Sequence, residues 1–220
     1  MSDAVPTIPA AIEGVLAVGV LLTEFALLRL LWVEGIIRNY ALQSFIVALF
    51  TAAVGLRTSN PDLYLLAALT LVIKAVGIPT VISMIVRRLG VDDRIPASVP
   101  VPLSFLIGAA LAAVGFAAAT KLSAGLHPGI GLQIGLSIVL IGFFLMTARA
   151  NAVAQLIGFL SLENGVFVAS VSLAAGMPLI AAVLLLLDVL VPAAAFLILI
   201  RVLANRHRSL HTIELTELRG

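Results

Sequence analysis

Four ionisable side chains stand within long apolar stretches of this chain: Glu24, Lys74, Glu163 and Asp188. On membrane-insertion scales, a charged residue at the centre of a spanning helix costs about 2.5–3.5 kcal/mol. We therefore expect all four side chains to face the interior of a helix bundle, where they pair with one another or are neutral. One lysine does not balance three acids, so at least one acid stays unpaired. An unpaired acid at bilayer depth is more often functional than structural.

The depths of these residues indicate which chemistry they suit. Lys74, Glu163 and Asp188 each lie ten to twelve residues into their stretches. At a rise of 1.5 Å per helical residue they share roughly one depth near the bilayer midplane, and Glu24 lies nearer the cytoplasmic side. A midplane row of acids and a base suits lateral proton transfer, because each group can change charge and influences its neighbours. The alternative is that Lys74 forms a single ion pair that only locks two helices together.

Three backbone features would shape the helices around these groups. Pro79 and Pro192 are candidate helix breaks, because each removes an i→i−4 hydrogen bond. The bond that Pro192 removes would free the carbonyl of Asp188 and loosen the helix at this acid. A loosened helix next to a titrating group suits gating or water entry. The alternative is a static kink. Gly165, which follows Asn164, predicts either close helix approach or a local π-bulge.

Six further polar residues would either extend a polar path or form ordinary interhelical hydrogen bonds: Gln43, Thr51, Gln133, Asn151, Gln155 and Ser161. The chain has no cysteine, which excludes disulfides and cysteine-ligated iron–sulfur or zinc sites. It carries no phosphate-binding glycine loop, nucleophile elbow or zinc signature, and its histidines lack metal-site spacing. We therefore expect no active site of its own, no metal and no cofactor.

The composition places the chain in a membrane. Hydrophobic residues make up 62% of it, charged residues only 11%, and the mean hydropathy is +1.21. A soluble domain typically carries about 25% charged residues. A chain this apolar cannot cover its surface with polar groups in water, whereas in lipid it need not. The net charge of +2 gives no indication of nucleic-acid binding.

Seven stretches reach the roughly 20 apolar residues that a spanning helix needs, and they cover residues 9–31, 36–56, 62–86, 101–121, 128–148, 152–175 and 178–203. Charged residues, glycines and prolines separate them. The sequence thus predicts an all-α, polytopic membrane protein with about seven transmembrane helices. A merged fifth and sixth stretch would give six helices, but Arg149 and Asn151 argue against merging. The first stretch is too long for a signal-peptide core and lacks a basic leader, so we expect a true span.

Basic residues predict the orientation. Ten of them fall at helix ends on one side: Arg29, Arg38, Arg87, Arg88, Arg94, Arg149, Arg201, Arg206, Arg208 and Arg219. Only Arg57 and Lys121 fall on the other side. By the positive-inside rule the first side is cytoplasmic. The N-terminus is then outside and the C-terminus cytoplasmic, which requires an odd number of spans and agrees with seven.

A weak internal repeat suggests how the chain is divided. The second and sixth stretches open with RNYALQ and RANAVAQ, and the third and seventh each carry a charged residue followed by a proline. We expect an N-terminal three-helix block over 1–100, a connecting helix over 101–127, and a second three-helix block with a cytoplasmic tail over 128–220. The alternative is that apolar helices resemble each other by composition alone.

Several segments resemble a known family. QLIGFLSLENGVFVAS, around Glu163, resembles the glutamate-bearing helix of complex I subunit K, and the final SLHTIELTELRG resembles that subunit's C-terminal segment. TLVIKAVGIPTVI around Lys74 and LLLDVLVPAA around Asp188 extend the likeness. Taken together, the chain resembles component E of hydrogenase-4, a membrane subunit of group 4 nickel–iron (NiFe) hydrogenase and formate hydrogenlyase complexes.

This resemblance implies a membrane-arm subunit of a complex I-like, energy-converting hydrogenase in the cytoplasmic (inner) membrane, with the redox chemistry on other subunits. The implied partners are antiporter-like and other membrane subunits, and, indirectly, peripheral iron–sulfur and NiFe-type subunits. Glu163 matches the first of two membrane glutamates of subunit K, and Asp188 stands on the helix of the second. We expect Glu163 and Asp188 to be stations of a proton or cation path, with Lys74 and Glu24 tuning their charge.

Two alternatives remain open at this point. The chain would be a purely structural anchor if its buried charges only hold helices together. It would be a stand-alone transporter of a small ion or solute if it works without partners.

Overall fold

The computed structural model describes residues 8–89, 94–96, 98–123 and 129–173, and the regular structure in this part of the chain is helical throughout. The helices are α1 (Ile8–Arg29), α2 (Val33–Thr58), α3 (Pro61–Leu69), η1 (Thr70–Gly77), α4 (Ile78–Leu89), α5 (Val101–Leu122), α6 (Gly131–Ala148) and α7 (Ala152–Leu173). α3, η1 and α4 follow one another without a break, so they form one continuous rod.

Six helices in the described residues are long and apolar enough to cross a membrane. They are Ala10–Arg29, Val33–Thr58, Pro61–Arg88, Val101–Leu122, Gly131–Ala148 and Ala152–Leu173. These match the first six predicted stretches closely, and the fifth and sixth remain separate helices. The chain is therefore an all-helical, multi-pass membrane protein. The predicted seventh stretch, 178–203, lies outside the described residues together with Asp188 and Pro192.

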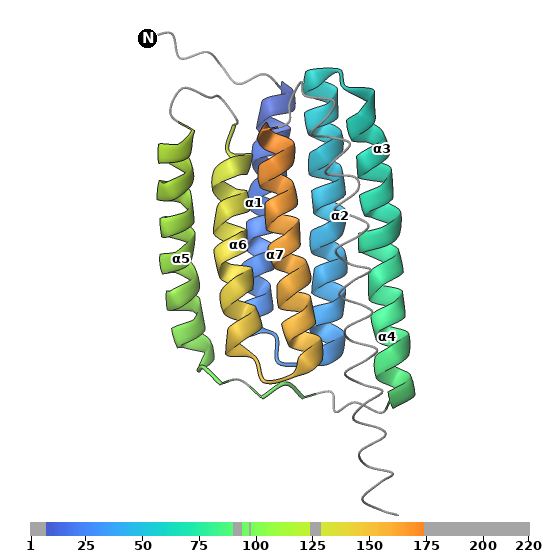
Figure 1. The fold of residues 1–220 in the computed structure, drawn as a ribbon, viewed down its shortest axis with the longest axis vertical. Coiled ribbons are helices and arrows are strands. Elements are labelled where there is room, and N and C mark those ends of the chain that lie inside the picture. Colours follow the sequence, from blue (N-terminus) through green and yellow to red (C-terminus); the bar gives the residue numbers. More distant parts are fainter. Residues whose placement is uncertain (1–7, 90–93, 97, 124–128, 174–220) are drawn as a thin grey trace, which may run out of the picture.

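The helices form one bundle of antiparallel neighbours (Figure 1). α1 packs on α2 and α6 packs on α7, and these two hairpins contact each other through α1–α6 and α2–α7. At one edge α5 packs on α6 and α1, while at the other edge the α3–η1–α4 rod packs on α2. The interior of the four central helices is therefore the place where buried polar groups meet.

Glycines bring α6 and α7 unusually close. A Cβ atom at Gly165 would lie 2.8 Å from both the carbonyl oxygen of Gly135 and the backbone nitrogen of Val139. A Cβ atom at Gly158 would lie 2.7 Å from the backbone nitrogen of Met146. Such contacts are typical of spanning helices, where van der Waals packing of small residues drives association. Of the two expectations for Gly165, close approach is confirmed and a π-bulge at this position is wrong, because α7 is a regular α-helix there.

The π-helical geometry lies instead in the third span. Residues Thr70–Gly77 form the π-helix η1, and the backbone N–H of Ile78 donates to the carbonyl of Ile73, five residues back. Pro79 follows directly, and it has no N–H with which to continue an i→i−4 ladder. At the candidate break Pro79 the rod continues through α4, and the hydrogen bonding widens from i→i−4 to i→i−5 on the N-terminal side of the proline. Lys74 lies inside this widened segment.

The basic residues of the described helices gather at one end of the bundle. α1, α4 and α6 finish at this end, and α2, α5 and α7 begin there (Figure 1). It carries Arg29, Arg38, Arg87, Arg88, Arg94 and Arg149, and we call it the basic end. Arg57 and Lys121 lie in the last turns of α2 and α5, at the opposite end. The four remaining arginines of the predicted cytoplasmic set, Arg201, Arg206, Arg208 and Arg219, lie outside the described residues.

Candidate functional site

An ion pair crosses from η1 to α7 in the middle of their spans. The Nζ atom of Lys74 lies 3.1 Å from Oε1 of Glu163. The lysine side chain is fully buried, and that of Glu163 is only 12% exposed. The lysine Nζ also lies 5.4 Å from the centre of the Phe167 ring. Glu163 and Phe167 are one turn apart on α7, so a carboxylate and an aromatic face both stabilise the ammonium group.

A second buried acid lies in a different environment. Glu24 of α1 is fully buried, and its Oε2 atom accepts a hydrogen bond of 2.7 Å from Nε2 of Gln43 on α2. The hydroxyl of Ser161 on α7 contacts the same oxygen. Both partners are neutral dipoles. Oε1 of Glu24 is buried and has no hydrogen-bond partner among the described residues.

Neutral side chains extend this environment along α7. Oε1 of Gln43 accepts from the Ser161 hydroxyl at 3.0 Å and from Nδ2 of Asn164 at 3.1 Å. Asn164 also donates to the Ser44 hydroxyl at 3.1 Å. Ser161 and Asn164 are three residues apart and therefore share one face of α7. We call Glu24, Gln43, Ser44, Ser161 and Asn164 the Glu24 cluster; every member is fully buried.

Glu163 and the Glu24 cluster use different faces of one helix, α7. Ser161 and Glu163 are two residues apart, which turns their side chains about 200° from each other around the axis of α7. α7 thus presents Ser161 and Asn164 to α1 and α2, and presents Glu163 and Phe167 to η1. Along the axis the two positions differ by only about 3 Å, with Ser161 nearer the basic end. A single helix therefore connects the ion pair with the Glu24 cluster.

The other predicted polar residues have local roles. Thr51 donates to the carbonyl of Val47 in its own helix at 2.9 Å. Asn151 accepts from the backbone N–H of Val153 at 2.8 Å and caps the start of α7. Gln155 donates to the carbonyl of Arg149 at 2.8 Å. Gln133 lies in the first turn of α6. Only Gln43 and Ser161 of the predicted six join the interhelical network around an acid.

Arg149 is a residue whose role the sequence does not reveal. Its side chain is 3% exposed, and Nη2 donates to the carbonyl of Leu28 at 2.6 Å, near the end of α1. Burial lowers the pKa of this guanidinium below its usual range. The sequence predicted a loop charge, whereas the side chain satisfies one of the last carbonyls of α1. The signal was the short connection: only residues 149–151 separate α6 from α7, which forces Arg149 against the helix ends.

Within the described ranges, no group of three or more His, Cys, Asp or Glu residues gathers as a metal site would. The site can therefore be described as two buried carboxyl groups, one held by a lysine and one held by neutral hydrogen-bond donors.

One relative places the chain in a family. The uncharacterized protein Rv0085 of Mycobacterium tuberculosis (strain ATCC 25618 / H37Rv) is 32% identical over 161 residues, which cover 71% of this chain and 73% of that protein. The chain belongs to the family of Rv0085. No protein-family model matches the chain. No solved structure matches it significantly either. The name of Rv0085 states no activity, so the function has to be argued from the buried groups.

Proposed function

We propose that this chain is a membrane-arm subunit of a complex I-like, energy-converting hydrogenase complex of the formate hydrogenlyase type, in which its buried carboxyl groups take part in proton or cation translocation. The observation that carries the proposal is the Lys74–Glu163 ion pair, 3.1 Å long, in the middle of two spanning helices. The likeness of the segments around Lys74 and Glu163 to hydrogenase-4 component E supplies the kind of complex.

The ion pair supports translocation better than it supports stability. A buried ion pair recovers little net stability, because removing both charges from water costs about as much as their attraction returns. Ionisable groups at membrane depth usually mark ion or proton pathways. A proton that reaches Glu163 removes a negative charge 3.1 Å from the Lys74 ammonium group, so the two groups titrate as one coupled unit. A charge change on a neighbouring subunit would act on both.

The Glu24 cluster supports the same proposal, because its hydrogen bonds depend on whether Glu24 carries a proton. The Ser161 hydroxyl has one hydrogen, yet it contacts two oxygens, Oε2 of Glu24 and Oε1 of Gln43. A proton on Oε2 of Glu24 allows the carboxyl to donate to Ser161 and Ser161 to donate to Gln43. Loss of that proton leaves one hydrogen for two acceptors. The cluster therefore changes its hydrogen bonding when Glu24 changes its protonation.

The proposal also covers the seventh span, the orientation of the chain and the membrane in which it lies. We include the seventh span with Asp188 as the second station, a cytoplasmic basic end, an outside N-terminus and a location in the cytoplasmic membrane. The gathering of six arginines at one end supports this orientation. The proposed partners are antiporter-like membrane subunits and, through them, iron–sulfur and NiFe-type subunits.

Replacing one oxygen of Glu163 tests the proposal. In native membranes, Glu163→Gln should leave the complex assembled and its electron transfer active, while proton translocation per electron falls by most of its value. The matched control is Glu34→Gln, because Glu34 is a glutamate whose side chain is 69% exposed at the basic end. Normal proton translocation in the Glu163 variant would sink the proposal.

A structural anchor is the second candidate, and the ion pair favours it to the extent that Lys74 joins η1 to α7. Under that function, Glu163→Gln lowers the yield of complex while translocation per assembled complex stays normal. A tagged chain purified from its own membranes in mild detergent separates both candidates from a stand-alone transporter. Co-purifying antiporter-like and iron–sulfur subunits support a complex, whereas a chain recovered alone that catalyses flux in liposomes supports a transporter.

A further inference from the structure

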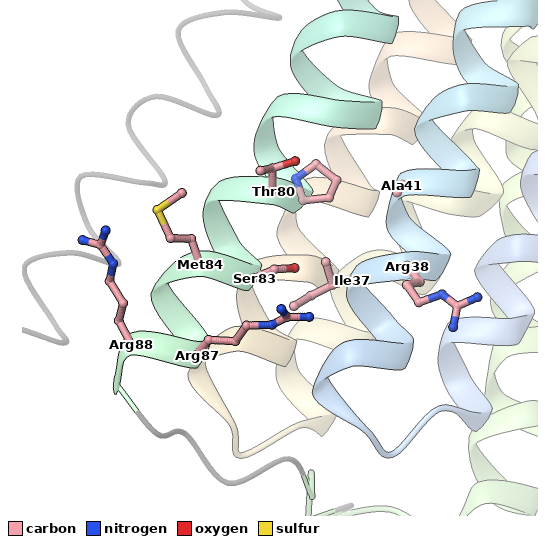
Figure 2. Close-up of a pocket in the computed structure, with 9 residues that line it drawn as sticks. Ile37, Arg38, Ala41, Thr80, Ser83, Met84, Arg87 and Arg88 are labelled. Carbon is pink, nitrogen blue, oxygen red and sulfur yellow. The ribbon is translucent and has the colours of Figure 1, made fainter.

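A groove between α2 and α4 opens at the surface of the basic end, away from both buried acids. Its volume is about 530 Å³, and Arg38 on α2 and Thr80, Ser83, Met84, Arg87 and Arg88 on α4 are among the residues that line it. In Figure 2 the side chain of Arg87 extends from α4 toward Ile37 of α2, while Arg38 and Arg88 lie on either side of it. Arg87 thus reaches across the groove, while the guanidinium groups of Arg38 and Arg88 point outward at its two sides (Figure 2).

The charge of the groove is strongly one-sided. Among the described residues, three arginines and no acidic residue line it. Arg87 forms a long ion pair with Glu34, with 4.0 Å between Nη2 and Oε1, and both side chains are more than two-thirds exposed. Exposed pairs at this separation contribute little free energy. The groove therefore attracts an anion, and guanidinium groups bind phosphate oxygens well because their N–H groups form a planar fork.

The chemical type of the residues that line the groove also changes with depth. From Arg87 back to Thr80 the chain rises by about 10 Å toward the bilayer centre. Over this length the lining passes from guanidinium groups, with the half-exposed side chain of Met84 next to them, to the hydroxyls of Ser83 and Thr80. The innermost lining residues are Pro79 and, on α2, Ala41. A charged mouth, hydroxyls below it and an apolar inner end follow the order of groups in a phospholipid: phosphate, glycerol esters and acyl chain.

We propose that this groove binds an anionic phospholipid, with its phosphate at Arg87 and an acyl chain along Pro79 and Ala41. Basic pockets between spanning helices are a known way of holding anionic head groups. The proposal is independent of the function proposed above, because it uses neither the ion pair nor the Glu24 cluster.

Trp32 provides the probe. It is the only tryptophan of the chain, and it lies directly before α2, six residues from Arg38 or about 9 Å along the helix axis. The full chain is placed in phosphatidylcholine nanodiscs that contain a small fraction of dansyl-labelled phosphatidylglycerol, and energy transfer from Trp32 to dansyl is measured. We expect saturable transfer that unlabelled phosphatidylglycerol displaces and that phosphatidylcholine does not. The Arg38→Gln, Arg87→Gln, Arg88→Gln triple variant should lose about a hundredfold in relative affinity, because each arginine near the membrane surface contributes about fivefold.

Single substitutions give the matched comparison. Arg87→Gln should weaken binding several-fold, whereas Arg29→Gln, at an exposed arginine of the basic end outside the groove, should not. All these side chains are exposed, and helical circular dichroism checks that each variant is folded. Trp32 keeps its contact with Arg94, 5.4 Å from the ring centre, in every variant.

Four results would overturn the proposal. They are equal transfer for labelled phosphatidylglycerol and labelled phosphatidylcholine, equal losses in Arg29→Gln and Arg87→Gln, and full displacement by inorganic phosphate. The fourth is transfer that appears only after Glu214→Gln and Glu217→Gln neutralise the acidic end of the chain, which would assign the groove to a protein segment.

Discussion

The two buried glutamates of this protein are balanced in opposite ways. Glu163 faces a lysine at 3.1 Å, and the Phe167 ring lies against the same ammonium group. Glu24 faces only an amide and a hydroxyl, from Gln43 and Ser161. Glu24 contacts α7 through Ser161, and Glu163 belongs to α7. The main difference between the two acids is therefore the chemistry of their partners.

The two glutamates differ in how strongly their burial depends on a charged neighbour. In the ion pair, each group makes the other's burial tolerable, so removing one leaves the other exposed to a large desolvation cost. In the Glu24 cluster the partners are neutral dipoles, so a change in the charge of Glu24 leaves no buried ion of opposite sign without its counter-ion. We expect the ion pair to be sensitive to neutralisation and the Glu24 cluster to be tolerant of it.

The largest expected effect comes from removing the lysine. Lys74→Met should lower the free energy of unfolding by about 3 kcal/mol, because Glu163 then lacks its cation. The measurement is unfolding of the purified chain in mixed micelles, followed by circular dichroism. A second substitution, Glu163→Met, should restore much of the loss in a double-mutant cycle.

The matched control for this prediction is the Arg57–Glu13 pair, 2.6 Å long but with side chains 31% and 12% exposed, toward the opposite end of the bundle. Arg57→Met should cost about 1 kcal/mol or less. If Lys74→Met lowers the free energy of unfolding no more than Arg57→Met does, the burial of Glu163 does not depend on Lys74. The two glutamates would then not differ in the way described above.

Much of this arrangement was readable from the sequence, and the reason is physical. Apolar runs and their punctuation gave six spans in the described residues, because the bilayer thickness fixes the length of a spanning helix. Insertion cost alone predicted that Glu24, Lys74 and Glu163 face the interior, and their burial agrees with this.

The sequence could not predict which acid pairs with Lys74. Each extra residue in a helical turn rotates the rest of the helix by about 100°, so the π-helix η1 changes which face of the third span the lysine shares. No regular period reveals that rotation. Arg149 was missed for a related reason, because its partner is a backbone carbonyl, Leu28, which is 121 residues away in the chain.

A substitution on α7 itself should disturb both acids together. Gly165→Ala places a methyl group 2.8 Å from the backbone of Gly135 and Val139, and backbone atoms cannot move aside as a side chain can. We expect a loss of about 2 kcal/mol in the free energy of unfolding.

The control for this change is Gly14→Ala, where a Cβ atom meets nothing within 4 Å. It should be neutral or slightly stabilising, because alanine loses less backbone entropy in a helix than glycine. Equal stability of the two alanine variants would mean that close approach of α6 and α7 does not position the acids.

A smaller effect tests the neutral donors. Ser161→Ala removes a hydroxyl that contacts both Glu24 and Gln43, and should cost about 1 kcal/mol. Ser172→Ala is the control on the same helix, because that buried hydroxyl donates to Val168 in its own helix at 2.8 Å. Its loss should cost less. The reverse order of the two losses would show that Ser161 serves α7 alone and does not stabilise Glu24.

The smallest expected effect comes from Glu24→Gln, and it tests the difference between the two glutamates most directly. Glu24→Gln keeps the shape of the side chain, and its amide oxygen still accepts from Gln43. Its amide nitrogen takes the place of Oε1, which has no hydrogen-bond partner among the described residues, so the free energy of unfolding should fall by at most about 1 kcal/mol. Glu163→Gln should cost about 1.5 kcal/mol in the same assay, since Lys74 keeps an acceptor and the Phe167 ring but loses its counter-charge. Equal effects of the two isosteric changes would mean that Lys74 does not depend on the charge of Glu163. The two glutamates would then be equivalent polar groups, and the ion pair could no longer carry the proposed role in translocation.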